Sequence, residues 1–233
     1  MPMRVVSASL SVDVREREVD ACWRPGATPT AADALAASIA LRFAVGAHGW
    51  AHLHAAAIEW DATTCVLVAG GSGSGKSTST LALVATGLAA MSDDGAFIRA
   101  DGLAVGVARP VHASPRTRAV FESLGEIGKS VETDKVELML HQPMQRDSRI
   151  VRAVVLPRVE PERPTSVDVA PAAEAFASLL GCCTPALLRG PWQEVAIDVV
   201  ARLTTRPLLA LRLGADALVR PAVVRELLEK GLR

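Results

Sequence analysis

The sequence has no excess of charge of either sign. Its 233 residues include 25 Lys and Arg and 25 Asp and Glu, so the formal net charge at pH 7 is zero. A protein that binds nucleic acid or an anionic membrane by general electrostatic attraction needs a basic surplus. The composition therefore gives no case for a polyanionic partner, and we expect neither nucleic acid nor membrane among the partners.

Cysteines and long hydrophobic runs are also scarce. The four cysteines, at positions 22, 65, 182 and 183, lack the spacing of a zinc site. Neighbouring cysteines such as Cys182 and Cys183 rarely bridge each other. The first residues contain no apolar signal-peptide core, and no run approaches the length that spans a membrane. We expect reduced thiols and a soluble, cytoplasmic protein.

One segment carries a strong motif. Residues 70–77 read Gly-Gly-Ser-Gly-Ser-Gly-Lys-Ser, which fits the phosphate-binding loop G-x-x-x-x-G-K-[ST]. The apolar run over residues 65–69 predicts a buried strand before this loop, and residues 78–86 have a helical pattern after it. Glycines let backbone N–H groups converge, and the helix points the positive end of its dipole at the same place. A nucleoside triphosphate is the expected ligand.

Each residue type in the loop has a chemical reason. Lys76 brings a mobile ammonium to the β- and γ-phosphates, and Ser77 offers a hydroxyl to the Mg²⁺ ion that bridges them. ATP and Mg²⁺ are therefore the expected cofactors. The expected nucleotide-binding residues are Gly70, Gly71, Ser72, Gly73, Ser74, Gly75, Lys76, Ser77 and Thr78.

The rest of the chain predicts an α/β protein. Alternation at Ala8, Leu10, Val12 and Val14 indicates an opening strand. Thr30 and Asp33 resemble a capping box before a helix over 31–45. A strand over 50–60 and a turn at 61–63 form a hairpin with the strand before the loop. We further expect strands over 97–98, 103–107, 136–140, 150–156 and 208–213, a helical turn over 118–124, a polar connection over 157–164, and helices over 172–180, 192–203 and 222–232.

Half of the residues are hydrophobic, so the chain can bury a substantial core as one domain. We expect a single domain over residues 1–233. Within it, residues 1–47 form an N-terminal strand and helix, 48–160 the nucleotide-binding core, and 161–233 the C-terminal helices and strand. The many strands between the loop and residue 160 favour a mixed sheet, flanked by helices, over regular β-α-β repetition.

An acidic pair, Asp93 and Asp94, follows the loop helix. The intervening chain is long enough to cross that helix and return along a short strand beside the phosphates. Adjacent side chains on an extended segment point in opposite directions. One carboxylate can then support Mg²⁺ while the other faces the acceptor and takes its hydroxyl proton. The alternative is that residues 93–95 form only a solvated turn.

Three segments together resemble a known family. They are His54-Ala55-Ala56-Ala57, the loop at 70–77, and Ser92-Asp93-Asp94. Their order and spacing resemble the catalytic core of the HPr kinase/phosphorylases and their shorter relatives, whose fold is akin to ATP-dependent phosphoenolpyruvate carboxykinase. The resemblance is clear over residues 48–110. It implies a P-loop kinase domain of this type, with Asp93 as the base, Asp94 and Ser77 as metal support, and His54 near the transferred phosphate.

The chain also departs from that family. It lacks the Gly-rich segment that helps HPr kinases engage HPr and metal, and residues 100–117 carry prolines and arginines instead. This argues against HPr as the substrate and against the reverse, phosphorylase reaction. Short relatives occur in peptide-modifying gene clusters and include kinases of lasso-type precursor peptides. The resemblance therefore implies a serine of a precursor peptide as acceptor, and the family's tendency to oligomerise implies a homo-oligomer.

Arginines are expected to complete the site, because the transferred phosphoryl group carries dispersed negative charge. Arg158, at the end of the predicted strand 150–156, and Arg109, in a loop after a strand, are the favoured candidates. Other candidates are Arg116 and Arg118, and below them Lys129 and Lys135.

Other classes of P-loop protein are disfavoured. The sequence has no N-K-x-D base reader of GTPases and no L-S-G-G-Q signature of ABC-type ATPases. The remaining alternatives are a small-molecule kinase, a nucleotide-binding switch without phosphotransfer, and a slow ATPase that uses water as acceptor. A carboxykinase is a poor fit, because such enzymes are much longer.

Overall fold

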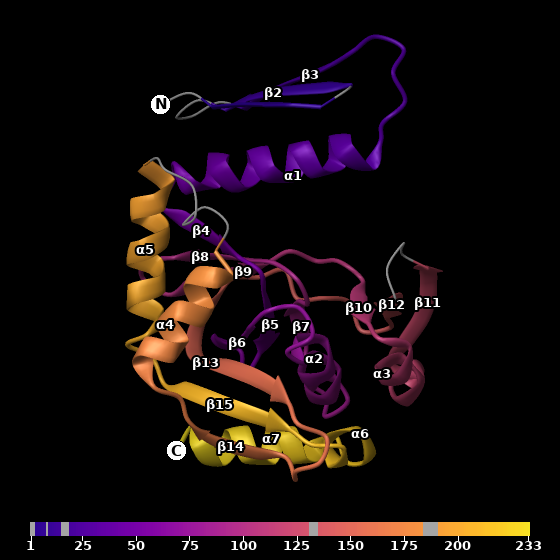
Figure 1. Cartoon of the computed structure of the whole chain (residues 1–233), viewed down its shortest axis with the longest axis vertical. Coiled ribbons are helices and arrows are strands. Elements are labelled where there is room, and N and C mark those ends of the chain that lie inside the picture. Colours follow the sequence, from indigo (N-terminus) through magenta and orange to yellow (C-terminus); the bar gives the residue numbers. More distant parts are fainter. Residues whose placement is uncertain (1–2, 8, 15–18, 131–134, 184–190) are drawn as a thin grey trace.

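The computed structural model describes residues 3–7, 9–14, 19–130, 135–183 and 191–233. Its centre is a mixed sheet flanked by helices, as the sequence predicts (Figure 1). The sheet has nine strands in the order β4-β8-β9-β13-β6-β5-β7, with β15 paired to β13 and β14 paired to β15. Their bounds are β4 Trp50–Leu53, β5 Ala55–Glu59, β6 Thr64–Ala69, β7 Ala90–Ser92, β8 Ala96–Arg99, β9 Leu103–Gly106, β13 Arg149–Val159, β14 Ser166–Val169 and β15 Leu208–Leu213.

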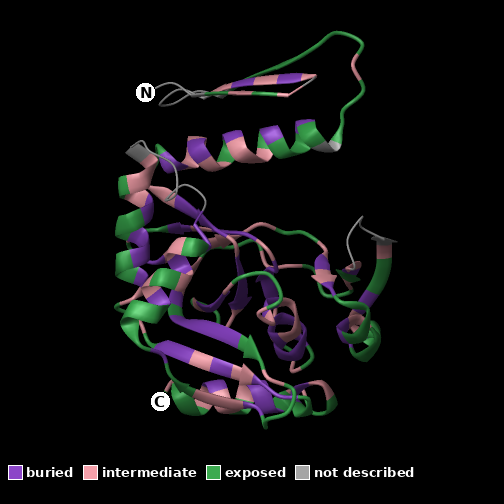
Figure 2. Cartoon of the chain, in the orientation of Figure 1, coloured by how far each residue is buried: buried purple, intermediate pink, exposed green. Residues whose placement is uncertain are grey.

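Both faces of the sheet are buried. Along β6, Cys65 and Leu67 belong to a core cluster with α4 (Ala172–Gly181) and α5 (Pro191–Leu203). Val66 and Val68 belong to a second cluster with α2 (Lys76–Val84), α6 (Asp216–Val219) and α7 (Ala222–Gly231). A strand covered on both faces needs a continuous apolar run instead of alternation, which explains the composition of residues 65–69. Strand β13 is likewise buried over most of its middle (Figure 2).

The N-terminal part forms a separate layer. Strands β1 (Met3–Val6), β2 (Leu10–Val14) and β3 (Val19–Trp23) pair in that order and lie over α1 (Ala31–Gly46) (Figure 1). The predicted capping box of α1 is confirmed, since Thr30 and Asp33 exchange side-chain to backbone hydrogen bonds. The sequence predicted only one strand here, and Ala8 lies outside the described residues.

A second small sheet borders α2. Its strands are β10 (Val111–Ala113), β12 (Val136–Leu140) and β11 (Gly125–Ser130), in that order. Between β10 and β11 lie α3 (Pro115–Val120) and a 3₁₀ turn over Glu122–Leu124. Of these elements the sequence predicted β12 and the helical turn, but not β10 or β11. The small sheet supplies one wall of the site.

Two expectations are wrong. The predicted strand over 50–60 breaks at His54, because β4 pairs with β8 whereas β5 pairs with β6 and β7. The hairpin between β5 and β6 is confirmed. The predicted polar connection begins too early, since β13 continues through Pro157 to Val159. The N–H of Val154 donates to Pro207 beside β15. Successive N–H groups of a strand face opposite neighbours, so an N–H at position 157 would face β6 and not β15. The pairing of β13 with β6 ends at Val155, so the proline removes no hydrogen bond from the sheet.

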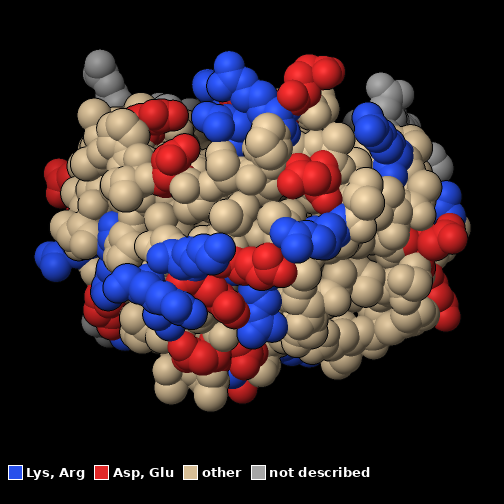
Figure 3. Space-filling model, turned by 90° about the horizontal axis from the view of Figure 1, so that it is seen from below, with Lys and Arg blue, Asp and Glu red and all other residues tan. Residues whose placement is uncertain are grey.

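Acidic and basic side chains intermingle on the face seen in Figure 3, in keeping with the balanced composition. No helix among the described residues is both long and apolar enough to cross a bilayer.

Candidate functional site

The phosphate loop lies between β6 and α2, as the sequence predicts. Gly73 and Gly75 adopt left-handed backbone angles, with φ of 77° and 107°. A Cβ atom on Gly75 would lie 2.5 Å from Cδ1 of Leu213. Glycine is therefore required at position 75 both by conformation and by the close approach of β15. Helix α2 begins directly after this glycine, which as the N-cap residue offers no side chain to the first N–H groups of the helix.

Lys76 is held inside the loop. It is only 7% exposed, and its Nζ donates hydrogen bonds to the carbonyl oxygens of Gly70 at 2.8 Å and Gly71 at 3.1 Å. Burial lowers the pKa of Lys76, while the carboxylates of Asp93 and Asp94 act in the opposite direction. Loop carbonyls thus accept hydrogen bonds from an ammonium group that has three N–H donors.

The acidic pair is carried by β7. This strand pairs with β5, and the N–H of Ala57 donates to Oγ of Ser92 at 3.1 Å. The chain bends directly after Ser92, so that Asp93 and Asp94 reach different surroundings. The two carboxylates therefore differ in burial and in hydrogen-bond partners.

Asp93 contacts the loop serine. Its Oδ2 accepts hydrogen bonds from Oγ of Ser77 and from the N–H of His112, both at 3.1 Å. The residue is 2% exposed, and burial raises its pKa although these two hydrogen bonds lower it. Its Oδ1 atom is buried without a hydrogen-bond partner among the described residues. The resemblance paired Ser77 with Asp94, whereas the structure pairs it with Asp93.

Asp94 instead contacts His54. The His54 Nδ1 atom lies 2.9 Å from Asp94 Oδ1, and the two side chains are 42% and 31% exposed. Burial would raise the pKa of Asp94, but the hydrogen bond from His54 and nearby positive charges lower it overall. His54 stands at the break between β4 and β5, where its N–H donates to the Cys182 carbonyl at 2.8 Å. The break thus turns the histidine toward the acidic pair.

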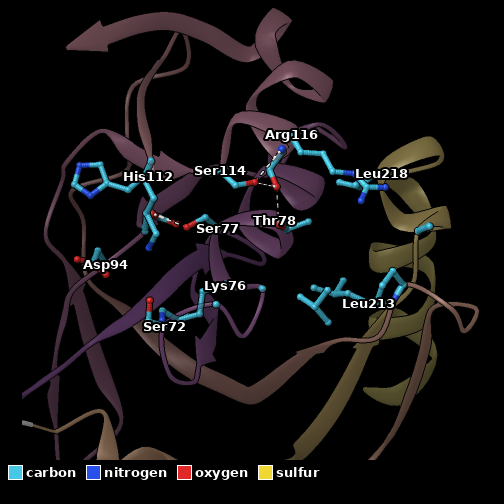
Figure 4. Close-up of a pocket in the computed structure, with 18 of the residues that line it drawn as sticks. Ser72, Lys76, Ser77, Thr78, Asp94, His112, Ser114, Arg116, Leu213 and Leu218 are labelled. Carbon is cyan, nitrogen blue, oxygen red and sulfur yellow. Dashed lines mark hydrogen bonds between the residues drawn. The ribbon is translucent and has the colours of Figure 1, made fainter. Parts of the chain in front are cut away.

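These groups line one cavity of about 530 Å³, which we call the loop cavity. Figure 4 shows Asp94 and His112 at one end, Leu213 and Leu218 at the other, and Lys76 and Ser77 between them. The apolar end also includes Val159, Pro161 and Ala215. One cavity thus combines a carboxylate end, a phosphate loop and an apolar end.

The favoured arginines lie elsewhere. Arg158 lines a second cavity of about 540 Å³, formed by residues 69–74, β13 and β15. Arg109 is not among the described residues that line either cavity. Arg116 and Lys135 line the loop cavity instead, and Arg116 extends from α3 toward Leu218 (Figure 4). Strand β13 continues past its predicted end, which explains where Arg158 lies. The side chain of Lys129 is outside the described residues.

The sequence missed several lining residues. His112 stands on β10, and its Nε2 atom lies 3.4 Å from Glu137 Oε1 on β12. Thr117 hydrogen-bonds to Thr78 at 3.2 Å, and Ser114 caps α3 by accepting from the Thr117 N–H. Pro115 after Ser114 is a helix-start pattern that could have been noticed. Nothing local indicates that His112 reaches Asp93.

The residues around Ser77 fit a Mg²⁺ ion. Mg²⁺ prefers oxygen ligands, keeps several waters and is held in such sites by one or two carboxylates and phosphates. The Ser77 hydroxyl and the unpartnered Oδ1 atom of Asp93 provide oxygens beside the loop. No cluster of three or more His, Cys, Asp or Glu suited to a metal occurs in the described part of the chain.

Comparison with known proteins finds no family model that matches this chain and no curated protein that matches it.

Proposed function

We propose that this chain is an ATP- and Mg²⁺-dependent kinase of the HPr kinase-like P-loop type. It transfers the γ-phosphoryl group of ATP to a serine hydroxyl of a peptide or protein, with a ribosomally made precursor peptide as the acceptor. The observation that carries the proposal is a pair of adjacent carboxylates at the phosphate loop, one bonded to Ser77 and the other to His54.

The nucleotide would lie along the loop cavity. Its triphosphate follows the loop, where Lys76 exchanges the Gly70 and Gly71 carbonyls for phosphate oxygens. Its base enters the apolar end beside Leu213 and Leu218. Arg116 lies at this end and is free to contact phosphate or ribose. In this orientation of the nucleotide, the γ-phosphate is the phosphate nearest Asp94 and His54.

Ser77 and Asp93 would hold the Mg²⁺ ion. When bound, the ion supplies positive charge that stabilises the transferring phosphoryl group. Asp93 keeps the Ser77 hydroxyl oriented through the 3.1 Å hydrogen bond. The resemblance implies Asp93 as the base and Asp94 as metal support, and this assignment exchanges the two roles. The reason is that Asp93 is buried and already accepts a hydrogen bond from Ser77.

Asp94 would orient the acceptor. Its lowered pKa keeps the carboxylate ionised at neutral pH, and His54 fixes one of its oxygens. The free oxygen accepts a hydrogen bond from the serine hydroxyl and takes its proton as the phosphoryl group transfers. In loose phosphoryl transfer, positioning by such a group contributes more than its basicity.

The test is mass spectrometry of a precursor peptide incubated with the protein and Mg²⁺-ATP. A peptide that gains one phosphoryl group with wild-type protein, but not with Asp94→Asn, supports the proposal. Arg202→Gln serves as a matched control, since Arg202 is an exposed residue of α5 paired with Asp198. Tight ATP binding without any transfer to serine peptides contradicts the kinase and favours a nucleotide-binding switch.

A further inference from the structure

Arg116 is a cation at an unfavourable position of its own helix. It follows Pro115 in the first turn of α3, after the N-cap residue Ser114. The first turn of a helix favours negative side chains, because its unpaired N–H groups and the helix dipole place positive charge there. The guanidinium has no ion pair or hydrogen bond with any residue that the structure describes. Local structure therefore gives no reason for an arginine here, and such exceptions are expected at functional sites.

Hydrogen bonds with the loop helix fix the place of α3. The hydroxyl groups of Thr117 and Thr78 lie 3.2 Å apart, and Thr78 directly follows Ser77 of the phosphate loop. Thr117 is 7% exposed, its hydroxyl accepts from Oγ of Ser114 at 3.0 Å, and its N–H donates to the same Oγ atom at 3.2 Å. The backbone that carries Arg116 is thus held at a defined place beside the phosphate loop.

The side chain of Arg116 reaches the apolar end of the loop cavity. Arg116, Leu213 and Leu218 all line this cavity. Figure 4 shows the arginine running from α3 to Leu218 on α6, and these two helices contact each other. Leu213 lies on the other side of this end in the same view. The apolar end therefore has a guanidinium and one leucine on one side and a second leucine on the other.

Hydrogen bonds also fix the turn that carries the two leucines. The hydroxyl of Thr165 donates to Oδ1 of Asp216 at 2.6 Å and accepts from the N–H of Gly214 at 3.1 Å. The N–H of Thr165 donates to the same carboxylate oxygen at 2.9 Å. Thr165 is 7% exposed, so water does not compete for these bonds. Both sides of the apolar end are therefore held by the fold itself.

A flat group fits the chemistry of this end. The triphosphate follows the loop beside Lys76 in the proposed function, whereas Arg116 reaches the end at which the base would lie. A guanidinium is planar and weakly hydrated, and it stacks on aromatic faces, including those of nucleic-acid bases. A purine has two fused rings and a pyrimidine has one, so a purine offers the larger face for stacking.

We infer that Arg116 stacks on the base of the nucleotide and makes the protein prefer purine to pyrimidine triphosphates. The inference rests on the proposed function for the place of the nucleotide. It concerns binding of the phosphate donor only, so it can be tested without an acceptor peptide.

Calorimetry with the Mg²⁺ complexes of ATP, CTP and inorganic triphosphate tests the inference. We expect wild-type protein to bind ATP about threefold to thirtyfold more tightly than CTP, the range that stacking of a cation on a ring supplies. Inorganic triphosphate has no base and reports the phosphate contacts alone.

Substitutions assign the preference to Arg116. Arg116→Gln should weaken ATP binding about threefold to thirtyfold and leave the binding of inorganic triphosphate unchanged. Arg116→Lys keeps the charge but loses the planar face, and it should weaken ATP binding in the same way. Arg202→Gln removes an exposed arginine of α5 and should change none of the three affinities. Arg116 is exposed, so both substitutions at this position are compatible with folding.

Equal binding of ATP and CTP to wild-type protein would overturn the inference. So would an equal loss of ATP and triphosphate affinity in Arg116→Gln, which would assign the arginine to phosphate, or full ATP affinity in Arg116→Lys. Phosphoryl transfer to a serine peptide is measured separately. An ATP preference that depends on Arg116, without any transfer, upholds the base contact and refutes the kinase. Equally efficient transfer from ATP and CTP upholds the kinase and refutes the base contact, and a lack of nucleotide binding refutes both.

Discussion

The two adjacent aspartates should respond differently to the same substitution. Asp93→Asn and Asp94→Asn each replace a carboxylate by a neutral group of nearly equal size. In the first case the change falls on a buried group bonded to Ser77 and His112, and in the second on a half-exposed group bonded to His54. We expect Asp93→Asn to weaken Mg²⁺-ATP binding and Asp94→Asn to suppress transfer while ATP still binds.

The magnitudes follow from these contacts. A hydrogen bond to a charged group contributes about 1.5–3 kcal/mol, so loss of the Asp93 charge should weaken Mg²⁺-ATP binding roughly 10- to 150-fold. Because burial raises the pKa of Asp93, the neutral side chain should not lower the free energy of unfolding. Loss of a positioned proton acceptor at Asp94 should reduce the transfer rate about 10²- to 10⁴-fold.

Calorimetry of ATP binding with and without Mg²⁺, single-turnover transfer and urea unfolding measure the three quantities. The reasoning is refuted if Asp94→Asn weakens Mg²⁺-ATP binding as much as Asp93→Asn does. It is also refuted if Asp93→Asn binds Mg²⁺-ATP normally and loses only transfer, since that result restores the roles implied by the resemblance.

Three further predictions concern the loop and its surroundings. Lys76→Gln should weaken ATP binding at least about tenfold in calorimetry, because it removes the ammonium beside the phosphates. Gly75→Ala should lower the free energy of unfolding in urea by about 1–3 kcal/mol, since φ is 107° and Leu213 blocks the added methyl group, whereas Gly71→Ala, with nothing within 4 Å, should change stability little. Burial lowers the pKa of His52 to about 3, so between pH 6.5 and pH 3 the unfolded chain takes up a proton that the folded chain does not. Stability should fall by about 2 kcal/mol at pH 5, and urea unfolding of His52→Gln should lose this part of the pH dependence.

The elements nearest the motif were predictable because their causes are local. A continuous apolar run, a glycine-rich turn and a helical pattern follow one another over residues 65–86, and each is set by its own residues. The helix after Thr30 is likewise fixed by a hydrogen-bond exchange within four residues. The structure reproduces these elements within one or two residues of their predicted bounds.

The break between β4 and β5 at His54 could not be predicted from local sequence. Residues on both sides of it are apolar and suit a strand, and nothing in them says that β4 and β5 pair with different neighbours. The same limit applies to the acidic pair. The bend after Ser92 decides which carboxylate contacts Ser77. That bend depends on two segments distant in the sequence, since β5 pairs with β7 and His112 of β10 donates to Asp93.

The arginines show how long-range pairing decides a site. The sequence favours Arg158 at the end of the predicted strand over 150–156, but pairing with β15 continues β13 past Arg158, which lines the second cavity. Arg109 is predicted by sequence to lie after a strand and does so, yet its charge lowers the pKa of Arg42 on α1 and of His52 on β4. His112 reaches Asp93 only because β10 pairs with β12 across a long connection.

The thin N-terminal layer should unfold locally more easily than the central sheet. Its core is a small cluster of Leu10, Val12, Ala36 and Ala40, whereas the central sheet is packed on both faces. Amide hydrogens of β2 should therefore exchange with solvent through a partial unfolding that leaves those of β6 protected. Since α1 belongs to this layer and contacts β4, the strand that leads to His54, such an opening would loosen the surroundings of His54 while the loop between β6 and α2 stayed folded.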